Sequence, residues 1–245
     1  YPQIEHCGDV TTADFTQYKG FDLLIGGSPC QDLCNMGSKK GLEGEKSSLF
    51  FEYVRALKES KPRFFLLENN ASMTQKNKDI ISSYMGVEPI FIDSIDFSAQ
   101  HRKRLYWTNI PFEPYTPKSI TLRDIAQPRE DKQEYDITDK VIKYLSPEYD
   151  GRKIQKTVSS KIKTLDDVSK CLGTYCGDYG NNTGLIIKYD DSYYSITPIE
   201  AERLQTLPDN YTEGVPPKKR FFGIGNGWTV DVIAHIFTYL KGGVE

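Results

Sequence analysis

Apolar and polar residues alternate in two different rhythms along the first half of the chain. Between short apolar runs, apolar side chains recur every three or four positions, which predicts helices over 49–57 and 78–85. Ser47 and Ser48 are suited to cap the first of these helices. The short runs read as strands and occupy 21–25, 63–67, 89–95 and 104–110. Strands alternating with helices predict an α/β fold with a parallel sheet.

The pattern changes in the second half. Residues 112–194 are first proline-rich, then charged, then rich in glycine and asparagine, which favours a small separate lobe. Within it, 185–189 and 192–196 form a predicted hairpin that turns at Asp190-Asp191. Thr197-Pro198-Ile199-Glu200 has the residues of a capping box, so a helix is expected to begin there, and a last helix near Thr229. We therefore expect three parts, at 1–111, 112–194 and 195–245.

Composition and charge narrow the classes of function. The 245 residues include 31 Lys and Arg against 34 Asp and Glu, and a net charge of −3 argues against coating nucleic acid through bulk charge. No apolar stretch is long enough to span a bilayer. Five cysteines without paired zinc-ligand spacing favour a reduced, cytoplasmic chain that binds no metal.

Three polar motifs follow or precede the predicted strands, and they carry the candidate chemistry. Cys30 lies on a glycine-rich loop at the carboxyl end of a strand, where open α/β sheets place their active sites. Loop amides and nearby arginines favour its thiolate form, which is the nucleophile. The other two motifs place a carboxylate and a basic cluster after it. The motifs read Gly26-Gly27-Ser28-Pro29-Cys30-Gln31, Glu68-Asn69 and Gln100-His101-Arg102-Lys103-Arg104.

Alternation along a strand places Gln100, Arg102 and Arg104 on one side of the last predicted strand. Two guanidinium groups there are expected to grip a nucleotide phosphate and a base carbonyl, and to hold Glu68.

Together the three motifs resemble those of the cytosine-5 DNA methyltransferases. The resemblance runs from Asp9 to the end of the chain. The residues within the motifs are similar to those of the de novo branch found in animals, with phage and bacterial relatives. Residues 195–200 with 203–205 are similar to the family's helix after its recognition domain. The run 225–228, Gly-Asn-Gly-Trp, is similar to the family's closing motif.

The resemblance implies an α/β fold with a Rossmann-like, S-adenosylmethionine-dependent methyltransferase sheet and a small inserted target-recognition lobe. The lobe would be 112–194, with 1–111 and 195–245 forming the catalytic domain. Double-stranded DNA would be the partner and S-adenosylmethionine the methyl donor. Because carbon 5 of cytosine is a poor nucleophile, a thiolate must first add to carbon 6 of a flipped-out base.

The family's residue roles carry over to matching positions of this chain. Cys30 would be the nucleophile and Glu68 the acid at N3, assisted by Asn69, Arg102 and Arg104. The substrate would be contacted by Ser28, Gln31 and Gln100. The cofactor would be bound by Asp9, Val10, Pro29, Leu49, Asn226, Gly227 and Trp228.

One family motif is missing from this sequence. The family begins with a strand and a Phe-x-Gly-x-Gly loop for the cofactor, whereas this chain begins Tyr1-Pro2-Gln3-Ile4. We therefore expect an N-terminally truncated sheet. Two other functions stay open, methylation of tRNA cytosine and a catalytically silent DNA-binding or regulatory role. The sequence leaves the target sequence, the biological role (restriction-modification, phage self-protection or regulation) and the oligomeric state undetermined.

Overall fold

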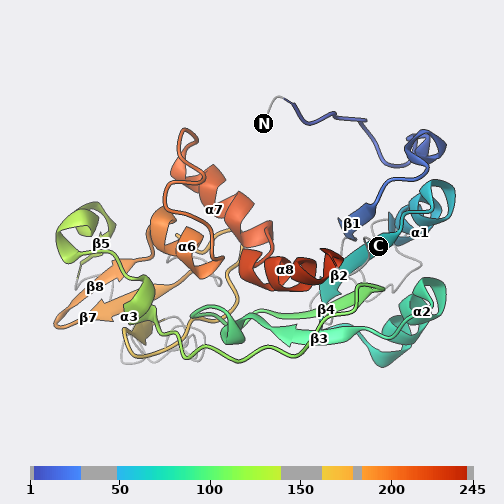
Figure 1. Cartoon of the computed structure of the whole chain (residues 1–245). Coiled ribbons are helices and arrows are strands. Elements are labelled where there is room, and N and C mark those ends of the chain that lie inside the picture. The colour runs from blue at the N-terminus through green and yellow to red at the C-terminus, as the bar shows by residue number, and fades with distance from the viewer. Residues whose placement is uncertain (1–2, 29–48, 139–161, 179–183, 242–245) are drawn as a thin grey trace. The chain divides into compact units, whose positions relative to one another are not determined.

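The computed structural model describes residues 3–28, 49–138, 162–178 and 184–241 (Figure 1). Contacts between Cα atoms divide the chain into two compact units. The first comprises Tyr1–Ile92, Lys103–Glu113 and Ile236–Glu245, and the second comprises Asp93–Arg102 and Pro114–His235. The second unit contains both the expected lobe and the helices that follow it, so these units do not test the predicted division at 112 and 195, which stays a prediction.

A four-stranded sheet organises the first unit. Its order is β1 (Leu23–Gly27), β2 (Phe64–Asn70), β4 (Lys103–Thr108) and β3 (Ile90–Asp93), so all four predicted strands are present. β1 and β2 are parallel, as expected, but β4 runs antiparallel to β2, and the expectation of a purely parallel sheet is wrong there. The stretch 94–102 between β3 and β4 is too short for a crossover helix, so the helix–strand alternation ends at β3.

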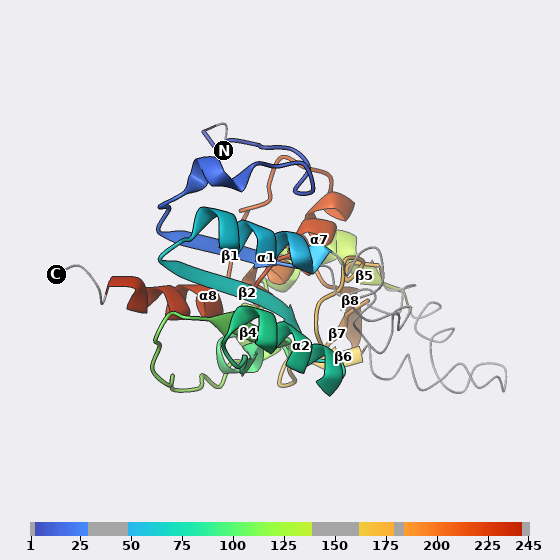
Figure 2. The ribbon, with the colours of Figure 1, turned by 90° about the vertical axis from the view of Figure 1, so that its right-hand side faces the viewer.

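Two helices cover one face of this sheet. Figure 2 shows α1 (Leu49–Ser60) lying along β1 and β2, and the Tyr53 ring packs where a side chain on Gly26 would otherwise project. α2 (Gln75–Met85) begins three residues before the predicted start, because Thr74 caps it. The predicted caps Ser47 and Ser48 lie outside the described residues. The shared core consists of Phe50, Tyr53, Val54, Phe65, Leu67, Met73, Ile81, Met85, Leu105 and Trp107.

A second sheet organises the second unit, in the order β5 (Asp136–Ile137), β8 (Ser192–Ser195), β7 (Ile186–Tyr189) and β6 (Ile162–Thr164). The predicted hairpin is confirmed, because β7 and β8 pair antiparallel. Asp190 adopts a φ of 51°, which an aspartate in a tight turn tolerates. The turn of the hairpin is polar, whereas Ile186, Ile187 and Tyr194 on its strands are buried. The strands therefore pack into the core of the second unit.

Helices complete the second unit. α6 (Pro198–Leu204) has the expected capping box, in which the Thr197 hydroxyl accepts from the Glu200 amide and the Glu200 carboxylate accepts from the Thr197 amide. α8 (Val230–Phe237) confirms the last predicted helix. The sequence did not predict α7 (Pro217–Asn226), whose glycines disfavour a helix but whose Phe221 and Ile224 are buried. Further helical segments among the described residues are α3 (Leu122–Ile125), η3 (Ser94–Asp96) and η4 (Arg129–Tyr135) in this unit, and η1 (Phe15–Tyr18) and η5 (Thr238–Lys241) in the first unit. In the part of the chain that is described, no helix has the length and apolar character to cross a bilayer.

Two buried ion pairs fasten α6 to its surroundings. Lys132 and Glu200 are both fully buried, with Nζ 3.0 Å from Oε1 and 3.8 Å from the centre of the Tyr194 ring. Glu202 is also fully buried, and its carboxylate accepts from the Thr212 amide at 2.8 Å and the Arg220 guanidinium at 2.9 Å. Such groups are stable in the interior because each charge has a partner and several donors.

We expect Glu202→Gln to lower the free energy of unfolding by about 2 kcal/mol at pH 7. Burial raises the pKa of the Glu202 carboxyl, but hydrogen bonds from Thr212 and Arg220 outweigh it, so the pKa lies below its ordinary value of 4.5. A carboxyl with a lowered pKa stabilises the fold above its unfolded pKa, and that stabilisation is lost as the pH falls through the folded pKa. Urea unfolding at pH 7 and below pH 4.5 therefore should show the difference between parent and variant shrinking on acidification. A difference independent of pH, or an equal effect of the exposed control Glu213→Gln, contradicts this assignment.

Candidate active site

Glu68 and Arg104 form an ion pair on the face of the first sheet opposite α1 and α2. In the β2–β4 register Glu68 lies opposite Tyr106 and Asn70 opposite Arg104, so the two charged side chains are diagonal neighbours on one face. Arg104 Nε lies 2.7 Å from Glu68 Oε1, and both side chains are only about one-eighth exposed, at 13% and 12%. The predicted contact between an arginine of the basic motif and Glu68 is thus present. The low exposure makes this pair stronger than a solvated surface ion pair.

Asn69 joins the carboxyl ends of β1 and β2. Its side chain is 2% exposed, and Nδ2 donates to the Ser28 carbonyl oxygen at 3.2 Å and to the Ser28 hydroxyl at 2.9 Å. Its Oδ1 accepts from the Asn70 amide at 2.8 Å. The resemblance implies that Asn69 assists the acid Glu68. In the structure its amide holds Ser28, two positions before Cys30, and its role beside Glu68 stays a prediction.

Three predicted site residues, Pro29, Cys30 and Gln31, lie outside the described residues. The described chain ends at Ser28 on one side of this segment and resumes at Leu49, the first residue of α1, on the other. Their roles as nucleophile, cofactor contact and substrate contact therefore remain predictions.

Arg102 and Arg104 have separate partners. β4 begins at Lys103, so Gln100 and Arg102 are not strand residues, and the expectation that strand alternation aligns all three is wrong. The Arg102 side chain is almost fully buried in the second unit. Its guanidinium donates to three carbonyl oxygens, those of Leu172 at 3.2 Å, Gly225 at 3.2 Å and Gly227 at 2.7 Å.

Gln100 is fully buried in the same unit. Its Nε2 donates to the Leu204 carbonyl oxygen and to Gln205 Oε1, and its Oε1 accepts from the Leu172 amide at 3.3 Å. Both amide ends of the side chain thus have protein partners. The predicted contact between Gln100 and a substrate remains untested.

The predicted closing motif lies at the end of α7. Asn226 is the last helical residue and is exposed, whereas Gly227 and Trp228 are partly buried. The Gly227 carbonyl oxygen accepts from Arg102 and, at 3.2 Å, from Gln205 Nε2. No positioning role was predicted for Gln205, because nothing in the sequence pattern shows that a glutamine at the end of one helix reaches the end of another.

Asp9 and Val10 lie on an exposed loop ahead of η1. Asp9 Oδ1 accepts from the Thr11 amide at 2.9 Å and the Thr11 hydroxyl at 2.8 Å. These hydrogen bonds, the backbone one first, hold the pKa of Asp9 below its usual 3.8. An ionised carboxylate beside an exposed valine fits an adenosine, which has polar edges and an apolar ring face. The contact of Asp9 and Val10 with the adenosine of S-adenosylmethionine stays a prediction.

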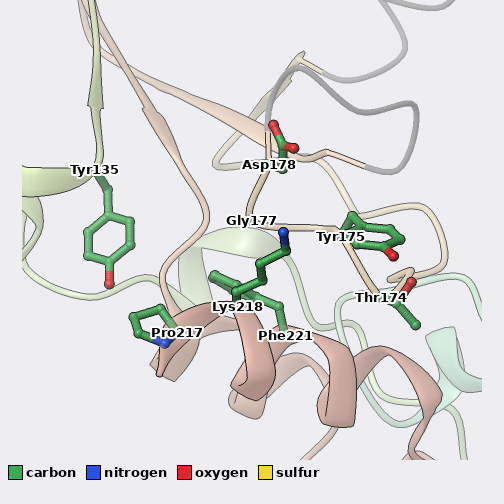
Figure 3. A pocket seen from close by; sticks show the side chains of 8 residues that line it. All are labelled: Tyr135, Thr174, Tyr175, Gly177, Asp178, Pro217, Lys218 and Phe221. Carbon is green, nitrogen blue, oxygen red and sulfur yellow. The ribbon is translucent and has the colours of Figure 1, made fainter. Parts of the chain in front are cut away.

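The second unit also contains a pocket of about 320 Å³. It lies between the end of η4, the loop 174–178 and the first turn of α7, and Figure 3 shows Tyr135 and Tyr175 on opposite sides of Pro217, Lys218 and Phe221. None of the predicted site residues lines it.

Cys176 in the second unit is fully buried. Burial raises the pKa of the Cys176 thiol to about 12, so this side chain stays protonated and unreactive at neutral pH. Among the described residues no group of three or more His, Cys, Asp or Glu side chains is arranged to hold a metal ion.

Comparison with known proteins places the chain in a family. Residues 1–242 match the family model described as C-5 cytosine-specific DNA methylase. Type II methyltransferase M1.ScrFI of Lactococcus lactis subsp. cremoris is 27% identical over 256 residues, covering 92% of this chain and 64% of that protein. Type II methyltransferase M.NlaX of Neisseria lactamica is 28% identical over 257 residues, covering 96% of this chain and 80% of that protein.

A solved structure supports the fold. The Entamoeba histolytica methyltransferase EhMeth superposes with a TM-score of 0.71 at 17% identity, covering 96% of this chain and 82% of that one. The predicted Rossmann-like methyltransferase fold is confirmed, and so is the predicted family, while its animal de novo branch stays a prediction. The chain belongs to the C-5 cytosine-specific DNA methylase family.

Proposed function

We propose that this chain is a DNA (cytosine-5) methyltransferase, which transfers a methyl group from S-adenosylmethionine to carbon 5 of cytosine. The observation that carries the proposal is the semi-buried Glu68–Arg104 pair at the end of β2, joined through Asn69 to the residue that precedes Pro29-Cys30. In a chain of the methylase family, a carboxyl held in this way at the end of β2 supports the proposal that Glu68 is the acid and that Cys30, two positions after Ser28, is the nucleophile.

The reaction requires carbon 5 to become nucleophilic. The Cys30 thiolate adds to carbon 6, and the electron pair of the 5,6 double bond moves to carbon 5. Glu68 donates a proton or hydrogen bond to N3 and so accepts part of the charge that enters the ring. Arg104 holds the Glu68 carboxyl in place at 2.7 Å. The methyl group of S-adenosylmethionine would bond to carbon 5 as the sulfonium C–S bond breaks and a neutral thioether leaves. Transfer of the carbon 5 proton to a base, with expulsion of the Cys30 thiolate from carbon 6, then restores the 5,6 double bond.

The ends of β1 and β2 hold Glu68 and Ser28 in fixed positions before a substrate arrives. Parallel pairing places Gly27 beside Glu68, and the Asn69 amide fixes Ser28. The loop that carries Cys30 thus starts from a point tied to the acid's own strand. Such preorganisation lowers the entropy cost of reaching the reactive geometry.

Cofactor and DNA contacts follow the family's pattern. When bound, S-adenosylmethionine would supply an electrophilic methyl group, and by the family's pattern it would be held by Asp9, Val10, Pro29, Leu49 and residues 226–228. A cytosine inside a duplex cannot reach the site, so the base is flipped out. By the family's pattern, Ser28 and Gln31 would contact the flipped nucleotide, and the lobe at 112–194 would read the neighbouring bases. Gln100 and Arg102, both buried in the second unit, would act by holding the segments around them.

Transfer of labelled methyl groups tests this function. We expect the chain to label unmethylated duplex DNA from S-adenosylmethionine, and to form a covalent adduct with a 5-fluorocytosine duplex when the cofactor is present. Label in tRNA but not in DNA assigns the chemistry to the RNA alternative. DNA binding that S-adenosylmethionine does not change, with neither label nor adduct, assigns a silent DNA-binding role.

A further inference from the structure

Arg55 on α1 connects this helix to the loop that bears Asp9 and Val10. Its Nη2 donates to the Val10 carbonyl oxygen at 2.7 Å, and its Nη1 donates to the Ala13 carbonyl oxygen at 2.8 Å. The guanidinium carbon also lies 4.7 Å from the centre of the Phe15 ring. One side chain therefore contacts the loop at three points, all within the first unit.

Two carboxylates fix the guanidinium of Arg55. Glu52 lies 2.8 Å from it and Glu59 3.2 Å, one helical turn to either side. The hydrogen bond with Glu52 is the main cause of a pKa above the usual value for Arg55. Glu59 also accepts from the Phe15 amide at 3.3 Å, so the same helix face holds the start of η1.

The loop itself has little apolar material to hold it. η1 contains no buried residue, and Asp9 and Val10 are exposed. Asp9 and Asp14 form local turns with Thr11 and Thr16, which set the backbone shape but do not attach the loop to the rest of the unit. The placement of residues 9–13 on α1 thus depends strongly on the polar contacts of Arg55.

We propose that Arg55 is the positioning residue of the adenosine site, because it sets where Asp9 and Val10 meet the cofactor. The inference rests on the proposed function, in which these two residues hold the adenosine of S-adenosylmethionine. Arg55 itself acts through the carbonyl groups of the loop and touches neither the cofactor nor the reacting atoms. Without it, the loop has to be ordered when the cofactor binds, and this ordering weakens binding.

The test compares Arg55→Gln, Arg55→Lys and a matched control on the same helix, Lys58→Gln, whose side chain is exposed. Three quantities are measured in the chain: the Kd for S-adenosylmethionine, the Kd for duplex DNA, and the hydrogen exchange of amides 9–19 without cofactor. We expect Arg55→Gln to raise the cofactor Kd about tenfold, since two charge-assisted hydrogen bonds order the loop. Exchange at 9–19 should be faster, while the DNA Kd and the control variant should match the parent.

Arg55→Lys separates positioning from folding. A lysine keeps the charge but cannot bridge both carbonyls in a fixed plane, so its cofactor Kd should lie between those of the parent and Arg55→Gln. Methyl transfer by both variants should approach the parent rate at saturating cofactor, with the change confined to KM. An unchanged cofactor Kd in Arg55→Gln, or an equal loss of DNA binding, overturns the inference. A parent chain that binds no S-adenosylmethionine is a different outcome, because it removes the proposed function and the inference with it.

Discussion

Replacing Cys30 with alanine is expected to reduce methyl transfer to DNA by about 10⁴-fold or more, to the background of the assay. Carbon 5 of cytosine becomes nucleophilic only after a thiolate has added to carbon 6, and alanine offers no group that could add. The loss corresponds to at least about 5.5 kcal/mol in the free energy of activation. Rates are measured with labelled S-adenosylmethionine and unmethylated duplex DNA at saturating concentrations of both.

Binding measurements distinguish lost chemistry from lost structure. Cys30→Ala should bind DNA and S-adenosylmethionine like the parent, but it should form no covalent adduct with a 5-fluorocytosine duplex. Cys7→Ala is the matched control, since Cys7 is an exposed cysteine outside the proposed site. Appreciable methyl transfer by Cys30→Ala, or an equal loss in Cys7→Ala, removes Cys30 from its proposed role.

Local sequence signals predicted most of the elements. The Thr197-Pro198-Ile199-Glu200 capping box and the turn at Asp190 depend only on neighbouring residues, and both occur in the structure. The direction of β4 depends instead on the connection from β3, so the period of the strand could not reveal it. α7 was not predicted because its glycines have a low helix propensity. In the structure, burial of Phe221 and Ile224 outweighs that propensity.

In the candidate site, too, some contacts could be predicted from the motifs, whereas others depend on how distant segments meet. Glu68 and Arg104 were predicted together because a motif places each at or beside a strand, and they meet at 2.7 Å. Arg102 belongs to the same motif as Arg104, yet its partners Gly225 and Gly227 lie more than 120 positions further along the chain. Asn69 likewise bonds Ser28, 41 residues earlier. Side-chain type indicates which groups can act, whereas the choice of a distant partner depends on how the fold brings segments together.

Glu68→Gln is expected to lower kcat/KM for methyl transfer by about 10²- to 10³-fold. Glutamine can still donate a hydrogen bond to N3 of the base, but it cannot transfer a proton as the thiolate adds. It also replaces the carboxyl group that pairs with Arg104, a side chain only 13% exposed. The Kd for S-adenosylmethionine should stay near the parent value. Glu88→Gln, an exposed carboxylate in the same unit, is the matched control and should retain parent activity.

A double-mutant cycle tests whether Glu68 and Arg104 act as one unit. If Arg104 works by holding the Glu68 carboxyl, then Arg104→Gln in the Glu68→Gln background should cost far less activity than it does in the parent. The two side chains are in direct contact at 2.7 Å, so strong coupling is expected. Additive losses contradict this arrangement and give Arg104 its own contact with the substrate. Because the ion pair joins neighbouring strands, urea unfolding of each variant is measured alongside, and a loss of activity that follows only the loss of stability counts against a catalytic role for the pair.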